Sequence, residues 1–203
     1  EEPSKALSYK ELAYGYSYPG GNAIGGQIIG RGSYIIPGIT TLDKETGAGK
    51  PGPEWTVGAQ GIEIEYNPLN HRYKIRKAIS VIDVGKVLNQ KMAEGQVMGA
   101  MSMGIAFAGR ETFYFDLWGR VQNPQLRTYR PLRYGEHPQY ICRFLETPHV
   151  EASYGARGLG EHGLLGMPAA LANGLSTAAS TSLNKLPLLP ELIWRSVAKE
   201  LGE

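Results

Sequence analysis

The sequence is poor in the residues that build cross-links and metal clusters. Its 203 residues contain a single cysteine, Cys142, so an internal disulfide, a CxxC metal site and an iron–sulfur cluster are all excluded within this chain. No apolar run approaches the roughly 20 residues that cross a bilayer. The chain does not open with a basic segment followed by an apolar one, which is the pattern of a secretory signal. We therefore expect a cytoplasmic protein without a membrane span.

The chain also lacks a strong excess of charge. Its 21 Lys and Arg residues nearly balance 19 Asp and Glu residues, for a net charge of +2, which points to neither nucleic acid nor an anionic membrane. Its histidines have spacings that fit no zinc site, and we expect no direct metal ligand. They are His71, His137, His149 and His162. His162 differs from the other histidines because it directly follows a glutamate, Glu161.

One glycine-rich stretch is the main candidate for a functional loop. Residues 155–161 read Gly155-Ala156-Arg157-Gly158-Leu159-Gly160-Glu161, and we call them the glycine loop. Glycine permits positive φ and close approach by another group. The stretch is typical either of a ligand-facing loop that ends in one carboxylate or of a turn with a surface glutamate. Composition alone does not separate the two.

Alternating polar and apolar residues predict several strands. The alternation is clearest over residues 62–66 and 73–81, which predict an antiparallel hairpin around a turn at 67–70. Asp83 follows as a strand-end turn former. Further strands are predicted over residues 27–36, 110–116 and 140–146, the last with Cys142 as a small core residue. Turn-forming residues over 39–54 predict an exposed loop, and residues 123–131 predict an irregular basic segment.

A helix is predicted over residues 91–108, where nearly every side chain is apolar or small. A helix that is apolar all round is buried. Asn89 either begins a turn or caps this helix. Gln96 is one of its few polar residues, and a buried amide must find partners. Gln96 therefore binds either neighbouring backbone or a polar ligand at the helix start.

Two more helices are predicted near the end of the chain. Leucine and alanine spacing predicts one over residues 164–183, with Pro168 in its first turn or at a kink. Pro190 is suited to begin the last helix, over 191–201. Residues 1–13 give a weak helical signal. Together with the strands, these helices predict an α+β fold.

A series of short motifs resembles the C-terminal part of the molybdenum-binding subunit of the molybdenum hydroxylases, the xanthine dehydrogenase and aldehyde oxidoreductase family. The motifs occur in the same order from about residue 55 to the end. They are residues 57–60, 81–89, 95–100, 123–124 with Tyr129, 146–149 and 155–161. The resemblance implies an α+β domain with a mixed or antiparallel sheet and packed helices.

The resemblance also implies roles for individual residues. Glu161 matches the glutamate that stands beside molybdenum as general base, and Gln96 matches a ligand of the molybdopterin cofactor. The loop residues Arg157, Gly158, Leu159 and Gly160 would offer backbone N–H groups and one cation to cofactor or substrate. His162 stands where relatives often carry proline or serine, so we expect it to line the substrate pocket. Met98 replaces a frequent glutamate.

The implied reaction is oxidative hydroxylation of a purine-like heterocycle, as in purine catabolism. Xanthine is favoured by overall resemblance to bacterial purine-degrading members, and aldehyde, nicotinate or carbon monoxide remain alternatives. The cofactor is molybdenum-molybdopterin, the cytosine dinucleotide form being one option. The holoenzyme is expected to carry 2Fe-2S clusters and FAD on other domains or subunits and to be oligomeric.

The length of the chain differs from that of the family's large subunit. We expect residues 1–203 to be a partial cofactor-binding domain, a C-terminal fragment or split subunit, with residues 1–54 as a loop-rich N-terminal segment. The remainder of the molybdenum subunit, an iron–sulfur subunit and a flavin subunit would be its partners, and the isolated chain is expected to be inactive. An alternative of another class is an interaction or scaffolding module without bound cofactor.

Overall fold

The computed structural model describes residues 15–17, 19–21, 23–24, 29–53 and 55–201. The chain divides into two units, Glu1–Ile35 and Ile36–Glu203. In the first unit, β1 (Tyr16–Ser17) pairs antiparallel with β2 (Ala23–Ile24). The helical signal of residues 1–13 lies outside the described residues.

The strand predicted over residues 27–36 is wrong where the structure describes it. Residues 29–36 form no strand, and Ile29 and Ile35 are exposed. An alternating apolar sequence becomes a strand only beside another strand that takes its hydrogen bonds, and residues 29–36 have no such neighbour within the described chain. The predicted loop is exposed over residues 39–50 and partly buried at residues 52–53.

The second unit is built on a three-stranded mixed sheet with the order β3-β4-β5. Strands β3 (Gly58–Asn67) and β4 (Arg72–Asp83) form the predicted antiparallel hairpin, and β5 (Gln139–Leu145) lies parallel to β4. One face is apolar, with Ala78 and Ile82 buried, whereas Glu63 and Lys77 form an ion pair on the other. This two-faced pattern explains the alternation in the sequence.

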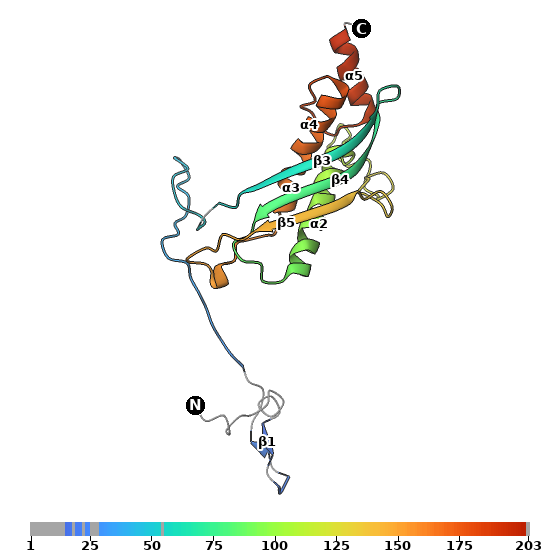
Figure 1. Cartoon of the computed structure of the whole chain (residues 1–203). Helices are drawn as coiled ribbons and strands as arrows, with labels where there is room; N and C mark the ends of the chain where they lie inside the picture. Colours follow the sequence, from blue (N-terminus) through green and yellow to red (C-terminus); the bar gives the residue numbers. More distant parts are fainter. Residues whose placement is uncertain (1–14, 18, 22, 25–28, 54, 202–203) are drawn as a thin grey trace. The chain divides into compact units, whose positions relative to one another are not determined.

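Helices pack on the apolar face of this sheet (Figure 1). Helix α2 (Gln90–Gly109) contributes Val97, Met101 and Ile105 to a core with β4 and β5. Helix α4 (Met167–Ala179) contributes Leu171 and Leu175 to a neighbouring core. The shorter elements are η1 (Ser153–Gly155), α3 (His162–Leu165) and α5 (Pro190–Leu201). Among the described residues, no helix is long and apolar enough to cross a membrane.

Helix α2 is capped as one of the two sequence alternatives predicts but is not buried all round. The Asn89 side chain accepts a hydrogen bond from the Met92 N–H at 3.1 Å, which is an N-cap. The opposite face of the helix is open, because Met103 and Phe107 are 55% and 51% exposed. The prediction of complete burial is therefore wrong, since the described chain covers only one face of α2.

The helix predicted over residues 164–183 is in fact two helices. Helix α3 ends at Leu165, and α4 begins at Met167 with Pro168 in its first turn, where the missing N–H of proline costs nothing. Helix α4 ends at Ala179 because Ser180 adopts the left-handed conformation, with φ of 51°. The last helix begins at Pro190, as predicted.

The strand predicted over residues 110–116 is also wrong. Its only bridge joins Phe115 to Val121. Residues 112–123 form a loop that is held closed by the buried Asn123. Its side chain accepts a hydrogen bond from the Tyr114 N–H at 2.9 Å and donates one to the Thr112 carbonyl at 2.7 Å. The strand predicted over 140–146 is confirmed as β5, with Cys142 buried; burial raises the pKa of its thiol.

Replacing either of two glycines of α2 by alanine should change stability, in opposite directions. A Cβ on Gly104 would lie 2.7 Å from the Leu164 carbonyl oxygen and 2.8 Å from the Met167 Cβ, whereas a Cβ on Gly99 would meet nothing within 4 Å. Gly104→Ala should lower the free energy of unfolding by about 1–3 kcal/mol through overpacking. Gly99→Ala should raise it by about 0.5–1 kcal/mol, because alanine favours the helix. Urea unfolding of both variants checks this, and equal shifts would contradict it.

Candidate functional site

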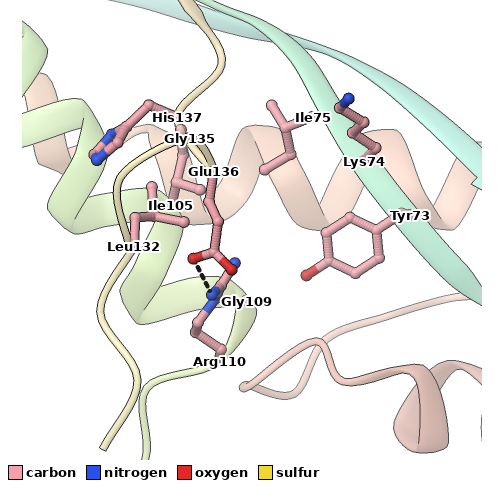
Figure 2. A pocket seen from close by; sticks show the side chains of 10 residues that line it. All are labelled: Tyr73, Lys74, Ile75, Ile105, Gly109, Arg110, Leu132, Gly135, Glu136 and His137. Atoms are coloured by element: carbon pink, nitrogen blue, oxygen red, sulfur yellow. Dashed lines mark hydrogen bonds and ion pairs between the residues drawn. The ribbon is translucent and has the colours of Figure 1, made fainter. Parts of the chain in front are cut away.

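A cavity of about 260 Å³ lies between β4, the end of α2 and the segment 132–137 (Figure 2). An Arg110–Glu136 ion pair of 2.7 Å stands at its edge. Burial raises the pKa of Tyr73, which also lines the cavity, to about 12. None of the site residues predicted from the sequence lines this cavity. Most of those residues lie in or next to the glycine loop, so we take this loop as the candidate site.

The glycine loop lies across the carboxyl ends of the parallel strands β4 and β5. The Arg157 N–H donates to the Val84 carbonyl at 2.9 Å, and the Val84 N–H donates to the Leu145 carbonyl at 3.0 Å. Gly85 and Gly155 both have positive φ, and a Cβ on Gly85 would collide with the Gly155 carbonyl. Here glycine is required by close packing between the loop and the strand end.

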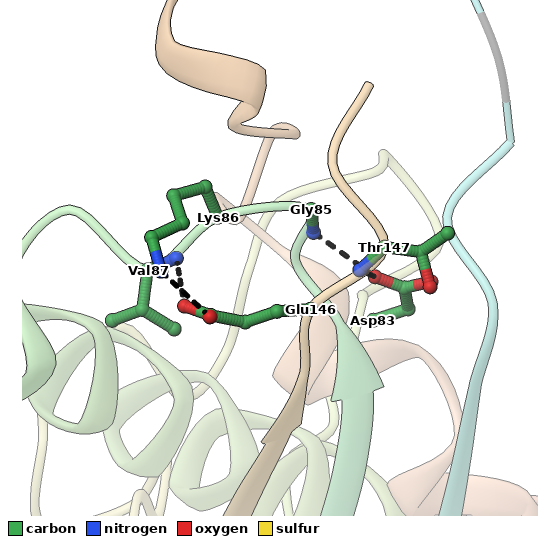
Figure 3. A network of polar contacts seen from close by, with 6 residues as sticks. All are labelled: Asp83, Gly85, Lys86, Val87, Glu146 and Thr147. Atoms are coloured by element: carbon green, nitrogen blue, oxygen red, sulfur yellow. Dashed lines mark hydrogen bonds and ion pairs between the residues drawn. The ribbon is translucent and has the colours of Figure 1, made fainter. Parts of the chain in front are cut away.

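Asp83 is the polar centre of this strand end (Figure 3). Its Oδ1 accepts hydrogen bonds from the N–H groups of Gly85 at 3.0 Å and Thr147 at 3.1 Å. The hydrogen bond from Gly85, with those from Thr147 and the nearby Arg157 charge, lowers the pKa of Asp83. Asp83 is thus the turn former that the sequence predicts, and it also holds the segment that leads to the glycine loop.

Arg157 joins three segments that are far apart in the sequence. Its guanidinium donates to the carbonyls of Trp55 at 3.1 Å and Thr147 at 3.0 Å. It also lies 3.8 Å from the Asp83 carboxylate, and the two side chains are only 12% and 15% exposed. These contacts fix the loop against the sheet. That Arg157 offers its cation to a ligand remains a prediction.

A second ion pair, between Glu146 and Lys86, holds the segment after β5 against the residues after β4 (Figure 3). Glu146 accepts from the Val87 N–H at 2.7 Å and from the Lys86 ammonium group at 2.8 Å. The hydrogen bond from Lys86, followed by that from Val87, lowers the pKa of Glu146. The end of β5 is thereby tied to the residues that lead from β4 into α2.

Gln96 binds the glycine loop from α2. Its side-chain Nε2 donates to the Gly160 carbonyl at 2.7 Å, which is the backbone contact that one of the two sequence interpretations expects. The expectation of a buried amide is wrong, because Gln96 is exposed. Its Oε1 makes no hydrogen bond with any described residue. Its role as a cofactor ligand remains a prediction.

Gln60 is a positioning residue whose role the sequence did not reveal. Its Nε2 lies within hydrogen-bonding distance of three oxygens: the Gly163 carbonyl at 2.8 Å, the His162 carbonyl at 3.3 Å and the Ser80 hydroxyl at 3.0 Å. These contacts tie α3 to the sheet immediately after Glu161. The available signal was a polar side chain on the apolar face of β3, which has to find partners.

Glu161 and His162 stand at the junction between the glycine loop and α3. Glu161 is exposed at the N-cap position, and its carboxylate makes no hydrogen bond or ion pair with the described residues. His162 is half-buried as the first residue of α3. Its Nδ1 has no hydrogen-bond partner among the described residues. Across the described residues, no three His, Cys, Asp or Glu side chains gather as a metal site would require.

The loop also leaves open space beside its backbone. A Cβ on Gly158 or Gly160 would meet nothing within 4 Å, and both residues are exposed. This differs from Gly155, where a Cβ would lie 2.9 Å from the Pro148 Cβ. The structure thus brings Gln96, Gly160, Glu161 and His162 together around an open stretch of backbone. Such an arrangement can receive a ligand at the loop while the exposed carboxylate accepts a proton.

Comparison with known proteins identifies similar sequences and folds. The sequence model of one protein family, the molybdopterin cofactor-binding domain, matches residues 1–138. The large subunit of nicotine 6-hydroxylase from Paenarthrobacter nicotinovorans is 31% identical over 147 residues, 71% of this chain and 18% of that subunit. The xanthine dehydrogenase molybdenum-binding subunit of Escherichia coli O157:H7 is 36% identical over 121 residues, 59% of this chain and 16% of that subunit.

The fold is also found in a solved structure. The aldehyde oxidoreductase from Desulfovibrio gigas superposes with a TM-score of 0.72 at 21% identity, over 93% of this chain and 21% of that one. The chain thus spans less than a fifth of the length of the two curated relatives named above.

The Asp83 contacts predict a pH-dependent contribution to stability. Because the pKa of Asp83 is lowered on folding, its carboxylate stabilises the folded state above the unfolded pKa of about 3.9, and this contribution is lost as pH falls through the folded pKa. Asp83→Asn should therefore lower the melting temperature at pH 7, with the difference from the unsubstituted chain narrowing below about pH 4. It should also speed hydrogen exchange at residues 155–160.

The matched control is Glu65→Gln, which breaks an exposed ion pair with Arg76 on the outer face of the sheet. Exposed pairs contribute little, so this change should leave both readouts nearly unaltered. If Asp83→Asn behaves like Glu65→Gln, Asp83 does not hold the glycine loop.

Proposed function

The chain belongs to the molybdopterin cofactor-binding domain family, and from this premise we propose that it supplies the base-bearing wall of a molybdenum hydroxylase active site. One observation carries the proposal: the exposed Glu161 carboxylate, without a protein partner among the described residues, ends a loop whose backbone is open at Gly158 and Gly160. Glu161 differs in this respect from Asp83 and Glu146, whose carboxylates accept hydrogen bonds from backbone N–H groups of the protein.

The residues present fit the cofactor that the family name implies. Gly158 and Gly160 lack side chains where an incoming group could approach the backbone, and Gln96 is exposed with its Oε1 unused within the described chain. These residues, with Leu159 and Arg157, would hold molybdenum-molybdopterin, for which the cytosine dinucleotide form is one option. When bound, the cofactor supplies the two-electron redox chemistry.

Glu161 acts as the general base in this proposal. A base must lie within hydrogen-bonding reach of the proton it removes, and its position must be fixed. Two amides fix it from opposite sides: Gln96 binds the carbonyl before Glu161, and Gln60 binds the carbonyls of the two residues after it. Its carboxylate is thereby held on restrained backbone while remaining available for proton transfer.

The proposed substrate is a purine-like heterocycle of the xanthine type. Support comes from the similarity to the xanthine dehydrogenase subunit. A nicotine hydroxylase subunit and an aldehyde oxidoreductase subunit are also among the relatives, so the alternatives that the sequence resemblance implies, aldehyde, nicotinate and carbon monoxide, stay as competing substrates. His162 follows the proposed base directly in the sequence, and its Nδ1 has no hydrogen-bond partner among the described residues. We assign His162 to the substrate pocket for this reason.

The proposed active enzyme needs parts beyond these 203 residues. The chain would combine with the remainder of a molybdenum-binding subunit and with iron–sulfur and flavin subunits in an oligomer, and it would be inactive alone. Support comes from the relatives named as a large subunit and as a subunit of a dehydrogenase complex, and from the short share of their length that this chain spans.

Replacement of Glu161 tests the proposal in the assembled enzyme. Glu161→Gln should reduce turnover by about 10²–10⁴-fold because the general base is lost, while molybdenum and pterin contents stay normal. Glu63→Gln, the same change on the outer face of the sheet, should leave turnover unaltered. Retained turnover in Glu161→Gln with normal molybdenum would refute the role of Glu161. An assembled enzyme without molybdenum or pterin would instead favour a scaffolding module.

Replacement of His162 tests its place in the substrate pocket. His162→Ser should change the ratio of kcat/KM for xanthine to that for an aromatic aldehyde by about tenfold, because it removes an imidazole that contacts the substrate. The cofactor content should not change. An equal loss with both substrates would show that His162 serves the fold of α3 rather than substrate choice.

A further inference from the structure

Helix α2 carries an exposed apolar stripe that the described chain leaves uncovered. We call it the open face, and its members recur every three or four residues, so they share one side of the helix. Three of them are large and apolar, with exposures of 72%, 55% and 51% for Met92, Met103 and Phe107. The members are Met92, Gly95, Gln96, Gly99, Met103 and Phe107.

The composition of α2 is unsuited to a face that meets water. From Gly95 to Gly109 the helix has no charged residue. A helix at the surface of a globular protein normally places charged and polar residues on its outer side, and a helix that is apolar all round is normally buried. The inner side of α2 is covered by the sheet and by α3 and α4, so the sequence of the open face calls for a second cover.

The glycines show how close that cover can come. A Cβ on Gly95 or Gly99 would meet nothing within 4 Å, whereas one on Gly104, on the inner side, would collide with the Leu164 carbonyl. Gly95 and Gly99 stand one turn apart, between the flanking Met92 and Met103. Because neither glycine has a side chain, another backbone can approach the helix closely between the two methionines.

We propose that the open face is the docking surface for the remainder of the molybdenum-binding subunit, an inference that rests on the proposed function. The matched segments span 18% and 16% of the two curated relatives, so more than four fifths of such a subunit lies outside the matched residues. That remainder is an obligate partner of the apolar kind that this face fits. Its contact segment would place a small residue or bare backbone against Gly95 and Gly99.

The open face continues into the glycine loop. Gln96 belongs to the open face, and its side chain donates to the Gly160 carbonyl next to Glu161. A segment docked on α2 therefore borders the loop and supplies the opposite wall of the active site. Because α2 contacts both the docked segment and the glycine loop, docking would fix the position of that wall relative to Glu161.

Binding of the full 203-residue chain to a polypeptide carrying the rest of the molybdenum-binding subunit, without cofactor, tests the proposal by calorimetry. We expect a 1:1 complex that Met103→Glu weakens at least tenfold. Gly99→Ala should also weaken it about tenfold although it stabilises the isolated chain, so a loss of binding cannot come from unfolding. The control is Leu69→Glu, at a hairpin tip that is 93% exposed, which should bind unchanged.

Methionine oxidation gives a second readout in the assembled enzyme. Hydrogen peroxide should oxidise Met92 and Met103 at least tenfold more slowly in the enzyme than in the isolated chain, whereas the buried Met101 and Met167 should be slow in both. Unchanged oxidation of Met103 overturns the proposal, and so does normal binding by Met103→Glu. A dimer of the isolated chain that Met103→Glu disrupts also overturns it, since a second copy would then be the occupant.

The docking proposal and the proposed function fail in different ways. A specific complex that depends on the open face but takes up neither molybdenum nor pterin supports docking and contradicts the proposed function. An enzyme with normal cofactor, a Glu161-dependent reaction and a freely oxidised Met103 contradicts docking alone.

Discussion

The position of the glycine loop depends on a pairing of opposite charges that is only slightly exposed to water, Asp83 with Arg157. Asp83 ends β4 and binds the backbone after β5, while Arg157 reaches from the loop to the same carboxylate and to two carbonyls. A charge that is largely buried must be paired and hydrogen-bonded. The requirement that both charges be satisfied joins segments that are up to about 100 residues apart and sets where the loop lies.

Two glutamine side chains then restrain the backbone around the proposed base. Gln96 comes from a helix and Gln60 from a strand, and each donates to a carbonyl adjoining Glu161 in the sequence. The acidic side chains of this region thus divide into two kinds. Asp83 and Glu146 are engaged by the protein, and Glu161 is left for chemistry, in the proposed function.

Helix α2 connects the fold, the site and the proposed partner. Its inner side closes the core through Met101 and Ile105, its Gln96 restrains the loop, and its outer side presents Met103 and Phe107. A single apolar sequence thus forms one interface with the sheet and, in our proposal, a second with the remainder of the subunit. Only one of them is formed within the described chain, which is why the helix looks like a core helix in sequence and is half exposed in the structure.

The sequence by itself determined the β3–β4 hairpin, the start of α5 at Pro190 and the family, because each rests on local periodicity or on short motifs, and it reduced Asn89 to two alternatives, a turn or a helix cap. It did not determine which apolar segments find partners: residues 29–36 and 110–116 alternate like strands yet form none. It also showed Gln60 as a polar residue without showing what it binds. Only the tertiary structure decided these points, because strand pairing, burial and hydrogen bonding depend on groups that are distant in the sequence.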